Sequence, residues 1–266
     1  MNKILLYHWV GEFGWCLIHN ALIRSLSEWY DKTIVIDRPL NYALYADFAK
    51  EFIPYSPQTN QTNYAKCKDT LPEGFYNRFE HTDLIPAGVQ LVHWSTSRGL
   101  FHYNDQYLKG ARPKYIRFGR KEPNLGYDIL IHARSTNKLH SGSRNWGIGN
   151  WMRLVEKLKG YHIACIGTED ASLHIDGTDD MRGIGMGKLV DLMASSRLIA
   201  GGSSGPMHLA SLCGTPHLVW STPINRLRYL RDWNPFGTEC LFVDQWGWHP
   251  PVEEIEKKLK GFFDNS

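Results

Sequence analysis

Residues 197–220 read RLIAGGSSGPMHLASLCGTPHLVW, and this stretch decides the fold. The apolar run at 197–201 has the composition of a buried strand, and a turn rich in glycine and serine follows it. Pro206 favours the first turn of a helix, and Gly214 stands where helices commonly end. A second apolar run at 217–220 predicts another strand. Such a succession predicts a parallel sheet whose ligands bind near the carboxyl ends of its strands.

Strand and helix patterns alternate on both sides of this stretch, which predicts an α/β protein. In the second half, the predicted strands are 127–132 and 163–167, and the predicted helices are 150–159 and 188–195. The helix at 150–159 has Asn150 as its candidate N-cap, and Gly160 follows its end. In the first half, strands are predicted at 4–7, 33–37 and 89–93, a helix between the first two, a loop at 11–14, and further loops over 54–82. A helical pattern also covers 252–263.

A boundary between two domains is predicted near Glu122. The stretch 109–124 carries basic residues together with Pro113 and Pro123, as links between domains often do. The domains are then 1–122 and 123–266, and the last helix is a candidate to pack back on the first domain.

The composition limits the class of protein. Of the 266 residues, 42% are hydrophobic and 21% are charged, which supports packed cores and excludes a disordered chain. A formal net charge of +3 suits an anionic ligand but is weak for a dedicated nucleic-acid-binding protein. The scattered cysteines lack zinc-ligand spacing, so we expect no metal and no cofactor. No apolar run reaches the roughly 18 residues that a membrane span needs, and we expect a cytoplasmic protein.

The turn between Gly201 and Gly205 has the features of an anion site. The first N–H groups of the helix that follows lack acceptors within that helix, and the positive end of the helix dipole lies behind them. Serine hydroxyls add donors, so a phosphate can be held there without a metal. The alternative is that Ser204 only caps the helix while the glycines permit close packing.

The same region is similar to a known family. Met181-Arg182-Gly183, the run 189–194, the run 201–212 and Gly214-Thr215-Pro216 resemble the C-terminal signature of the heptosyltransferases, which use ADP-heptose; the similarity covers about 127–223. It implies the GT-B architecture, with two Rossmann-like domains facing a cleft, the acceptor on the first and the nucleotide sugar on the second. It also implies donor-diphosphate contacts for Ser203, Ser204, Gly205, Met207 and His208, although Ser203 stands where the family usually has an acidic residue. Gly202, in the same turn, is placed with the donor-binding residues.

Further donor-binding candidates follow the other predicted strands. Arg134 ends the strand at 127–132, where a guanidinium can grip a diphosphate, and its His-x-Arg context is similar to that of several fucosyltransferases. Lys138 and Arg144 come later in the same loop, where a solvated basic loop is the alternative. By position alone, Thr168 and Glu169 are candidates for the base or ribose. Gly14, in the first loop of the chain, is placed with the donor-binding residues.

The predicted reaction needs one general base. Resemblance to the heptosyltransferases, which have a Gly-Asp pair in the first loop, makes Glu12 the first candidate; an exposed loop glutamate is the alternative. Asp37, at the end of the second strand, is the other candidate. The base would take the acceptor proton during an inverting, metal-independent transfer of a sugar to a hydroxyl of a glycan or a lipopolysaccharide-like acceptor.

Two other functions stay open on the sequence. A phage-type DNA glycosyltransferase would also have a GT-B fold, and basic residues could face the DNA backbone: Arg112, Lys114, Arg117, Arg120 and Lys121. A noncatalytic nucleotide-sugar-binding protein would bind the donor without turnover.

Overall fold

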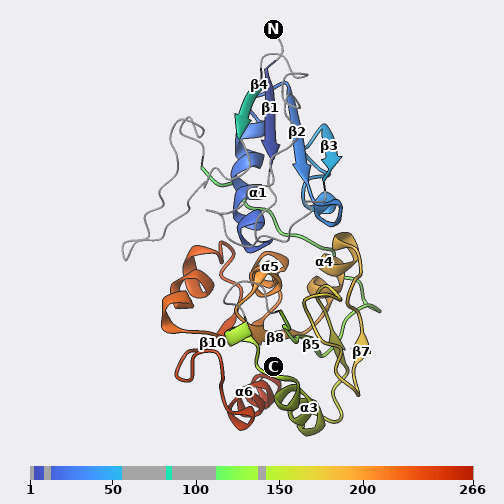
Figure 1. Cartoon of the computed structure of the whole chain (residues 1–266), viewed down its shortest axis with the longest axis vertical. Helices are drawn as coiled ribbons and strands as arrows, with labels where there is room; N and C mark the ends of the chain where they lie inside the picture. The colour runs from blue at the N-terminus through green and yellow to red at the C-terminus, as the bar shows by residue number, and fades with distance from the viewer. Residues whose placement is uncertain (1–2, 9–12, 56–81, 86–111, 137–141, 266) are drawn as a thin grey trace. The chain divides into compact units, whose positions relative to one another are not determined.

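The computed structural model describes residues 3–8, 13–55, 82–85, 112–136 and 142–265 (Figure 1). The chain forms two compact units, Met1–Ile116 and Arg117–Ser266. The sequence places the boundary at Glu122, and the structural division lies between Ile116 and Arg117. Each unit contains its own parallel sheet.

Unit 1 is built on a four-stranded sheet in the order β3-β2-β1-β4. Its described elements are β1 (Ile4–His8), α1 (Phe13–Ser27), β2 (Lys32–Asp37), the 3-10 helix η1 (Pro39–Leu44), β3 (Glu51–Pro54) and β4 (Thr82–Ile85). All three strand pairs are parallel, with β1 between β2 and β4. Nearly every residue of β1 and β2 is buried, as in central strands covered on both faces.

The structure corrects the sequence prediction for unit 1 in two places. The helix α1 begins at Phe13, so Phe13 and Gly14 form its first turn and are not part of a loop. The strands β3 and β4 were not predicted, because each has only four residues and neither has the long apolar run of a buried strand: their sequences are EFIP and TDLI. The predicted strand at 89–93 lies outside the described residues.

Unit 2 has a six-stranded parallel sheet in the order β10-β9-β8-β5-β6-β7. Its described elements are β5 (Ile129–His132), η4 (Gly142–Arg144), α3 (Ile148–Lys157), β6 (Ile163–Cys165), β7 (Asp179–Asp180), α4 (Met186–Ser195), β8 (Leu198–Gly202), α5 (Gly205–Cys213), β9 (His217–Trp220), η5 (Pro223–Asn225), the π-helix η6 (Arg228–Asp232), β10 (Cys240–Val243) and α6 (Val252–Asp264). Along the chain the strands are added outward from β5 to β7 on one side, and from β8 to β10 on the other. The direction of winding therefore changes between β5 and β8, as in a doubly wound Rossmann-like domain.

The start of α3 differs from the sequence prediction. Gly147 is the N-cap, with a φ of 85°, and Asn150 lies inside the first turn. The Asn150 amide nitrogen donates to the carbonyl of Trp146 at 2.6 Å, so this side chain holds the preceding loop. The helix ends at Lys157, and Gly160 follows in a turn with a φ of 104°.

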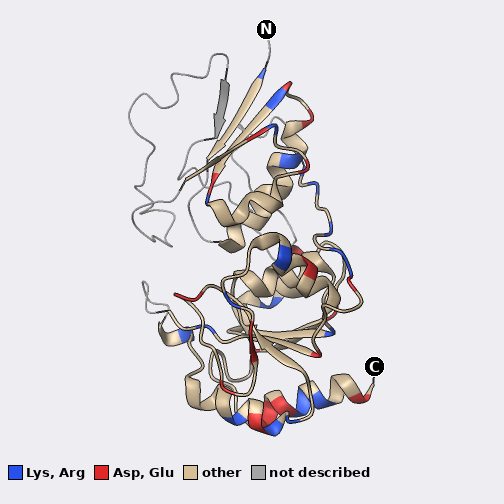
Figure 2. Cartoon of the chain, turned by 90° about the vertical axis from the view of Figure 1, so that its right-hand side faces the viewer, with Lys and Arg blue, Asp and Glu red and all other residues tan. Residues whose placement is uncertain are grey.

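The core of unit 2 contains three packed tryptophans. The rings of Trp146 and Trp220 have centroids 4.9 Å apart, and Trp151 lies 5.4 Å from Trp220. The helix α6 adds Val252, Ile255 and Leu259 to this core, while its exposed face carries acidic and basic residues (Figure 2). The apolar face of α6 is thus used within unit 2. Among the described residues, no helix combines the length and apolarity that crossing a membrane requires.

Candidate functional site

The candidate site lies where β5 and β8 run side by side. The two strands pair in parallel with His132 opposite Gly201, so their carboxyl ends meet at one edge of the sheet. This is the point at which the winding of the sheet changes direction. Open α/β sheets bind ligands outside the carboxyl ends of the strands at such a point. The topology of the sheet alone therefore makes the loops after β5 and β8 the candidate ligand-binding loops.

Two glycines let β8 approach its neighbours closely. A Cβ added at Gly201 would lie 3.0 Å from the sulfur of Met207 and 3.2 Å from the carbonyl oxygen of His132. A Cβ at Gly202 would lie 3.3 Å from Nε1 of Trp220. Close packing thus accounts for Gly201 and Gly202, as one of the two sequence interpretations proposed.

The other part of that interpretation, in which Ser204 caps α5, is confirmed for its position and not for its side chain. Ser204 is the N-cap residue in an extended conformation, but its hydroxyl makes no capping hydrogen bond. Instead, the Ser204 hydroxyl lies 2.9 Å from Nδ1 of His132 at the end of β5. Pro206 has no N–H, and the amides of Gly205 and Met207 have no acceptor within the helix. The first main-chain donors of α5 are therefore not used within the helix itself.

The amides of the two serines are already used inside the protein. The Ser203 N–H donates to the carbonyl of Trp220 at 3.0 Å, and the Ser204 N–H donates to the hydroxyl of Tyr229 at 3.1 Å. Both serines are half-buried, so their hydroxyls are accessible in part. The main-chain donors of this turn therefore come from the helix, and the serines contribute their side chains.

Buried aromatic rings support the turn from below. His208 stacks on Tyr229, with ring centroids 4.1 Å apart and 12° between the planes, and it also contacts Trp233. Burial, together with Arg228 and His217, holds the pKa of His208 well below its usual value. The imidazole of His208 is therefore neutral and packs in the interior, although the sequence placed it among the donor-binding residues.

His132 is the second buried histidine of the site. Burial, and then the charge of Arg134, lowers the pKa of His132 to about 4. At neutral pH the ring is uncharged, so it can exchange one hydrogen bond with Ser204 without adding charge. Sequence reasoning had noted His132 only as the neighbour of Arg134.

Arg134 is held in the loop after β5 by Asn145. The Arg134 guanidinium donates to Oδ1 of Asn145 at 3.0 Å, and the Asn145 amide donates to the carbonyl of Thr136 at 3.1 Å. The main chain of Arg134 also pairs with Ser172, in the loop after β6. Asn145 was missed by the sequence analysis, because an asparagine in a polar loop carries no signal of this contact.

Three other donor-binding candidates are exposed: Arg144, Thr168 and Glu169. The Arg144 guanidinium lies over the ring of Trp248, 5.1 Å from its centroid. Thr168 and Glu169 form a turn after β6, and the Glu169 carboxylate lies beside Gly183. Gly14 belongs to the first turn of α1 in unit 1. Two candidates lie outside the described residues: Glu12 and Lys138.

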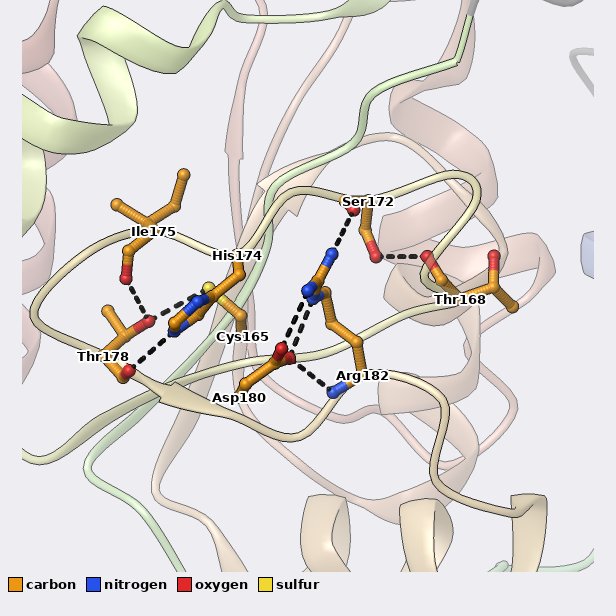
Figure 3. A network of polar contacts seen from close by, with 8 residues as sticks. All are labelled: Cys165, Thr168, Ser172, His174, Ile175, Thr178, Asp180 and Arg182. Atoms are coloured by element: carbon orange, nitrogen blue, oxygen red, sulfur yellow. Dashed lines mark hydrogen bonds and ion pairs between the residues drawn. The ribbon is translucent and has the colours of Figure 1, made fainter.

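A polar network fixes the loops after β6 and β7 (Figure 3). Arg182 donates to both carboxylate oxygens of Asp180, at 2.8 and 2.7 Å, and to the carbonyl of Ser172 at 2.9 Å. This partner lowers the pKa of Asp180 to about 2. Because Ser172 also pairs with Arg134, three loops at this edge of the sheet are linked by hydrogen bonds.

Asp37, the second candidate for the general base, is 1% exposed at the end of β2. Its carboxylate accepts from the N–H of Arg38 at 2.6 Å, from Asn41 at 3.0 Å and from the hydroxyl of Tyr45 at 2.8 Å. The thiol of Cys16 lies 3.4 Å away. Burial raises the pKa of Asp37 to about 6. These contacts suit a residue that ties α1, β2 and η1 together.

Comparison with known proteins identifies the fold. No family model matches the chain, and no curated protein matches its sequence. Among solved structures it is similar to the E. coli ADP-heptose lps heptosyltransferase II, with a TM-score of 0.61 at 12% identity over 99% of both chains. The E. coli heptosyltransferase WaaC with ADP gives a TM-score of 0.61 at 10% identity, covering 98% of this chain and 100% of the other. The iron-containing heptosyltransferase TibC of enterotoxigenic E. coli gives 0.57 at 14% identity, covering 99% of this chain and 76% of that one.

These likenesses extend over nearly the whole chain, whereas the sequence resemblance covers mainly the second domain. At such low identity they establish the architecture and leave the chemistry to the residues described above. The two Rossmann-like units, each with a parallel sheet, confirm the predicted fold class. The chain has the GT-B fold of the heptosyltransferases.

Proposed function

We propose that the protein is a glycosyltransferase that takes a sugar from a nucleotide diphosphate donor. The observation that carries this proposal is the N-terminus of α5, which has no side-chain cap because the Ser204 hydroxyl turns to His132. An uncapped helix start at the switch point of a doubly wound sheet suits an anionic ligand. The GT-B fold makes a nucleotide sugar the natural source of that anion.

In this proposal the diphosphate lies against the amides of Gly205 and Met207. The Ser203 hydroxyl adds a neutral donor, and Arg134 adds a positive charge. The Ser204 hydroxyl is a second donor in the tautomer of His132 that carries its proton on Nδ1, because Ser204 then accepts from His132 and keeps its own proton for the ligand. As the bond from the sugar to the diphosphate breaks, negative charge grows on the departing oxygen, and these donors stabilise it. Thr168 and Glu169 are proposed to contact the ribose or base, and the remaining basic candidates of the loop after β5 to contact the phosphates: Lys138 and Arg144.

The acceptor is proposed to be a hydroxyl of a glycan or a lipopolysaccharide-like molecule. Its oxygen attacks the anomeric carbon from the face opposite the diphosphate, so the configuration inverts. Glu12 receives the proton of that hydroxyl, and the nucleoside diphosphate leaves with the electron pair of the broken bond. We keep Glu12 ahead of Asp37 because the Asp37 carboxylate is buried and already accepts several hydrogen bonds.

Donor binding can be tested by thermal shift with UDP-, GDP-, ADP-, CMP- and dTDP-sugars. A donor present at about 100 times its Kd stabilises the native protein by about 2.7 kcal/mol, which a melting curve resolves. Arg134→Gln should weaken the binding of the active donor by about tenfold or more, as expected for a hydrogen bond to a charged group. Arg153→Gln is the matched control, since Arg153 is exposed on α3, where its guanidinium donates to Asn150 at 2.9 Å. Failure of all donors to shift the melting curve would sink the proposal.

Catalysis is tested with Glu12→Gln. The variant should lose turnover while it retains the thermal shift with the donor, because only the proton acceptor is removed. Wild-type turnover in this variant would remove Glu12 from the mechanism. TibC is an iron-containing enzyme, so metal independence needs its own measurement. Turnover that survives dialysis against EDTA is the expected result.

A DNA acceptor is the less favoured alternative. Two of the five basic residues that could face DNA are engaged within their own units: Lys114 pairs with Glu28, and Arg117 lies over the ring of Phe236. Gel shifts with duplex DNA across a salt series would reveal such an acceptor through a steep loss of binding with salt. Donor binding with neither turnover nor slow donor hydrolysis would instead indicate a noncatalytic binding protein.

A further inference from the structure

Tyr229 lies beneath the turn between β8 and α5, and the predicted site did not include it. Its side chain is fully buried, and it comes from the π-helix η6. π-Helical turns often occur at functional sites. The phenol hydroxyl meets the two serines of the turn: it lies 2.9 Å from Oγ of Ser203 and 3.1 Å from the N–H of Ser204. Tyr229 therefore contacts both serines through a single atom.

The hydrogens of this contact can be assigned by counting donors. The Ser204 N–H can only donate, so the Tyr229 oxygen accepts from it. Burial raises the pKa of Tyr229 above its usual value, so the phenol keeps its own proton at neutral pH. The shortest contact open to that proton is Oγ of Ser203, at 2.9 Å, against 3.4 Å to the carbonyl oxygen of Ser204. Ser203 is thus the acceptor of the phenol proton.

A serine hydroxyl that accepts one hydrogen bond still has its own proton to donate. Ser203 is half-buried at the edge of the sheet where α5 begins, so this proton can be directed toward a ligand at the helix N-terminus. A hydrogen bond received from Tyr229 also polarises the Ser203 hydroxyl and makes it a stronger donor. The chain of donation then runs from Tyr229 through Ser203 to the ligand.

We propose that Tyr229 is a positioning residue that directs the Ser203 hydroxyl proton at a phosphoryl oxygen of a nucleoside diphosphate. This inference rests on the proposed function of the site. It gives Ser203 a role that a carboxylate at that position could not perform, since a carboxylate only accepts hydrogen bonds when ionised. The site would thereby hold the diphosphate with neutral hydroxyl donors on this side of the helix start.

The test is a double-mutant cycle with Tyr229→Phe and Ser203→Ala, read by calorimetric binding of ADP, GDP and UDP and of the nucleosides adenosine, guanosine and uridine. Each single variant should bind the preferred diphosphate about tenfold more weakly, as for a lost hydrogen bond to a charged group. The double variant should bind it no more weakly than Ser203→Ala alone, because Tyr229 acts through Ser203. Affinity for the matching nucleoside should stay unchanged in all three variants.

The control is Tyr127→Phe, which removes a different tyrosine hydroxyl, one that bonds to Asp179 at 2.9 Å on the edge of the sheet. It should bind the diphosphate as the wild type does. Additive losses in the double variant, or equal losses for nucleoside and diphosphate, would overturn the inference and leave the proposed function standing. Should the wild type bind none of the three diphosphates, the inference and the nucleotide site would both fall. If Tyr229→Phe does not fold, Ser203→Ala alone decides: an unchanged affinity for the diphosphate refutes the role of the Ser203 proton.

Discussion

The pH dependence of stability in unit 1 is expected to depend on Asp37. Burial raises the pKa of this carboxyl from 3.8 to about 6. Below about pH 3 the carboxyl is protonated in both the folded and the unfolded chain, so it imposes no penalty. As the pH rises from about 4 to about 6, the unfolded chain releases the proton while the folded chain still holds it, and the unfolded state is favoured. The stability contributed by the neutral carboxyl is lost over this window.

The size of the effect follows from the two pKa values. A difference of one pKa unit corresponds to about 1.4 kcal/mol, so the rise to about 6 corresponds to a loss of about 3 kcal/mol above pH 6. Asp37→Asn should abolish this dependence, because an amide does not ionise. Its oxygen can still accept from Arg38 and Asn41, so the fold should be retained. If Asp37 has no catalytic role, turnover at neutral pH should be retained as well.

The measurement is urea unfolding of both proteins at intervals from pH 4 to pH 7.5. The free energy of unfolding of the wild type should fall relative to that of Asp37→Asn across this range. Asp31→Asn is the matched control, since it makes the same chemical change at an exposed position of unit 1. Its pH dependence should follow the wild type. A wild-type stability that rises between pH 4 and pH 6 relative to Asp37→Asn would refute the reasoning, because it would mean that the donors around the carboxylate outweigh its burial.

Two further predictions concern unit 2. Gly201→Ala places a methyl group 3.0 Å from the sulfur of Met207, so it should destabilise the protein by about 1–3 kcal/mol. At Gly149 in α3 a methyl group has open space, so Gly149→Ala should leave the stability unchanged or raise it by up to about 1 kcal/mol. Thermal melts compare the two variants, and equal melting temperatures would contradict the packing argument. Arg182→Gln removes the partner that lowers the pKa of Asp180, at an exposed site where the ion pair is worth less than about 1 kcal/mol. Urea titrations should show that the variant unfolds slightly more easily than the wild type, and that this difference shrinks as the pH falls from about 4 to about 2, because protonation of Asp180 removes the ion pair from the wild type. A difference that grows in acid would contradict the prediction.

The sequence by itself determined the fold class, and it predicted the place of the candidate site in the chain. Continuous apolar runs predict buried parallel strands, and the order of glycine, serine and proline predicts the turn between β8 and α5. Gly214 was predicted to end α5, and it does so with a φ of 76°. These signals are local, because each depends on the conformation that a few consecutive residues can adopt.

The short outer strands escaped prediction. The strand β7 is two aspartates, and β3 is EFIP, so neither carries an apolar run. Such strands form because a neighbouring strand presents main-chain N–H and C=O groups for pairing. The sequence of the short strand does not show that this neighbour exists. The start of α3 was misplaced for a related reason, since Asn150 bonds to the preceding loop and does not cap the helix.

Only the tertiary structure decided which hydrogen-bonding atoms of the candidate site are used within the protein. The Ser204 hydroxyl could have made a capping hydrogen bond to α5, but it bonds to His132, which lies far away in the sequence. In the same way, the Ser204 N–H is used by the hydroxyl of Tyr229, and Asp37 is enclosed by three side chains from α1 and the region of η1. The sequence around a hydrogen-bond donor is the same whether the donor bonds to a ligand or to a distant residue. The partner of each donor can therefore be identified only once the fold has brought these groups together.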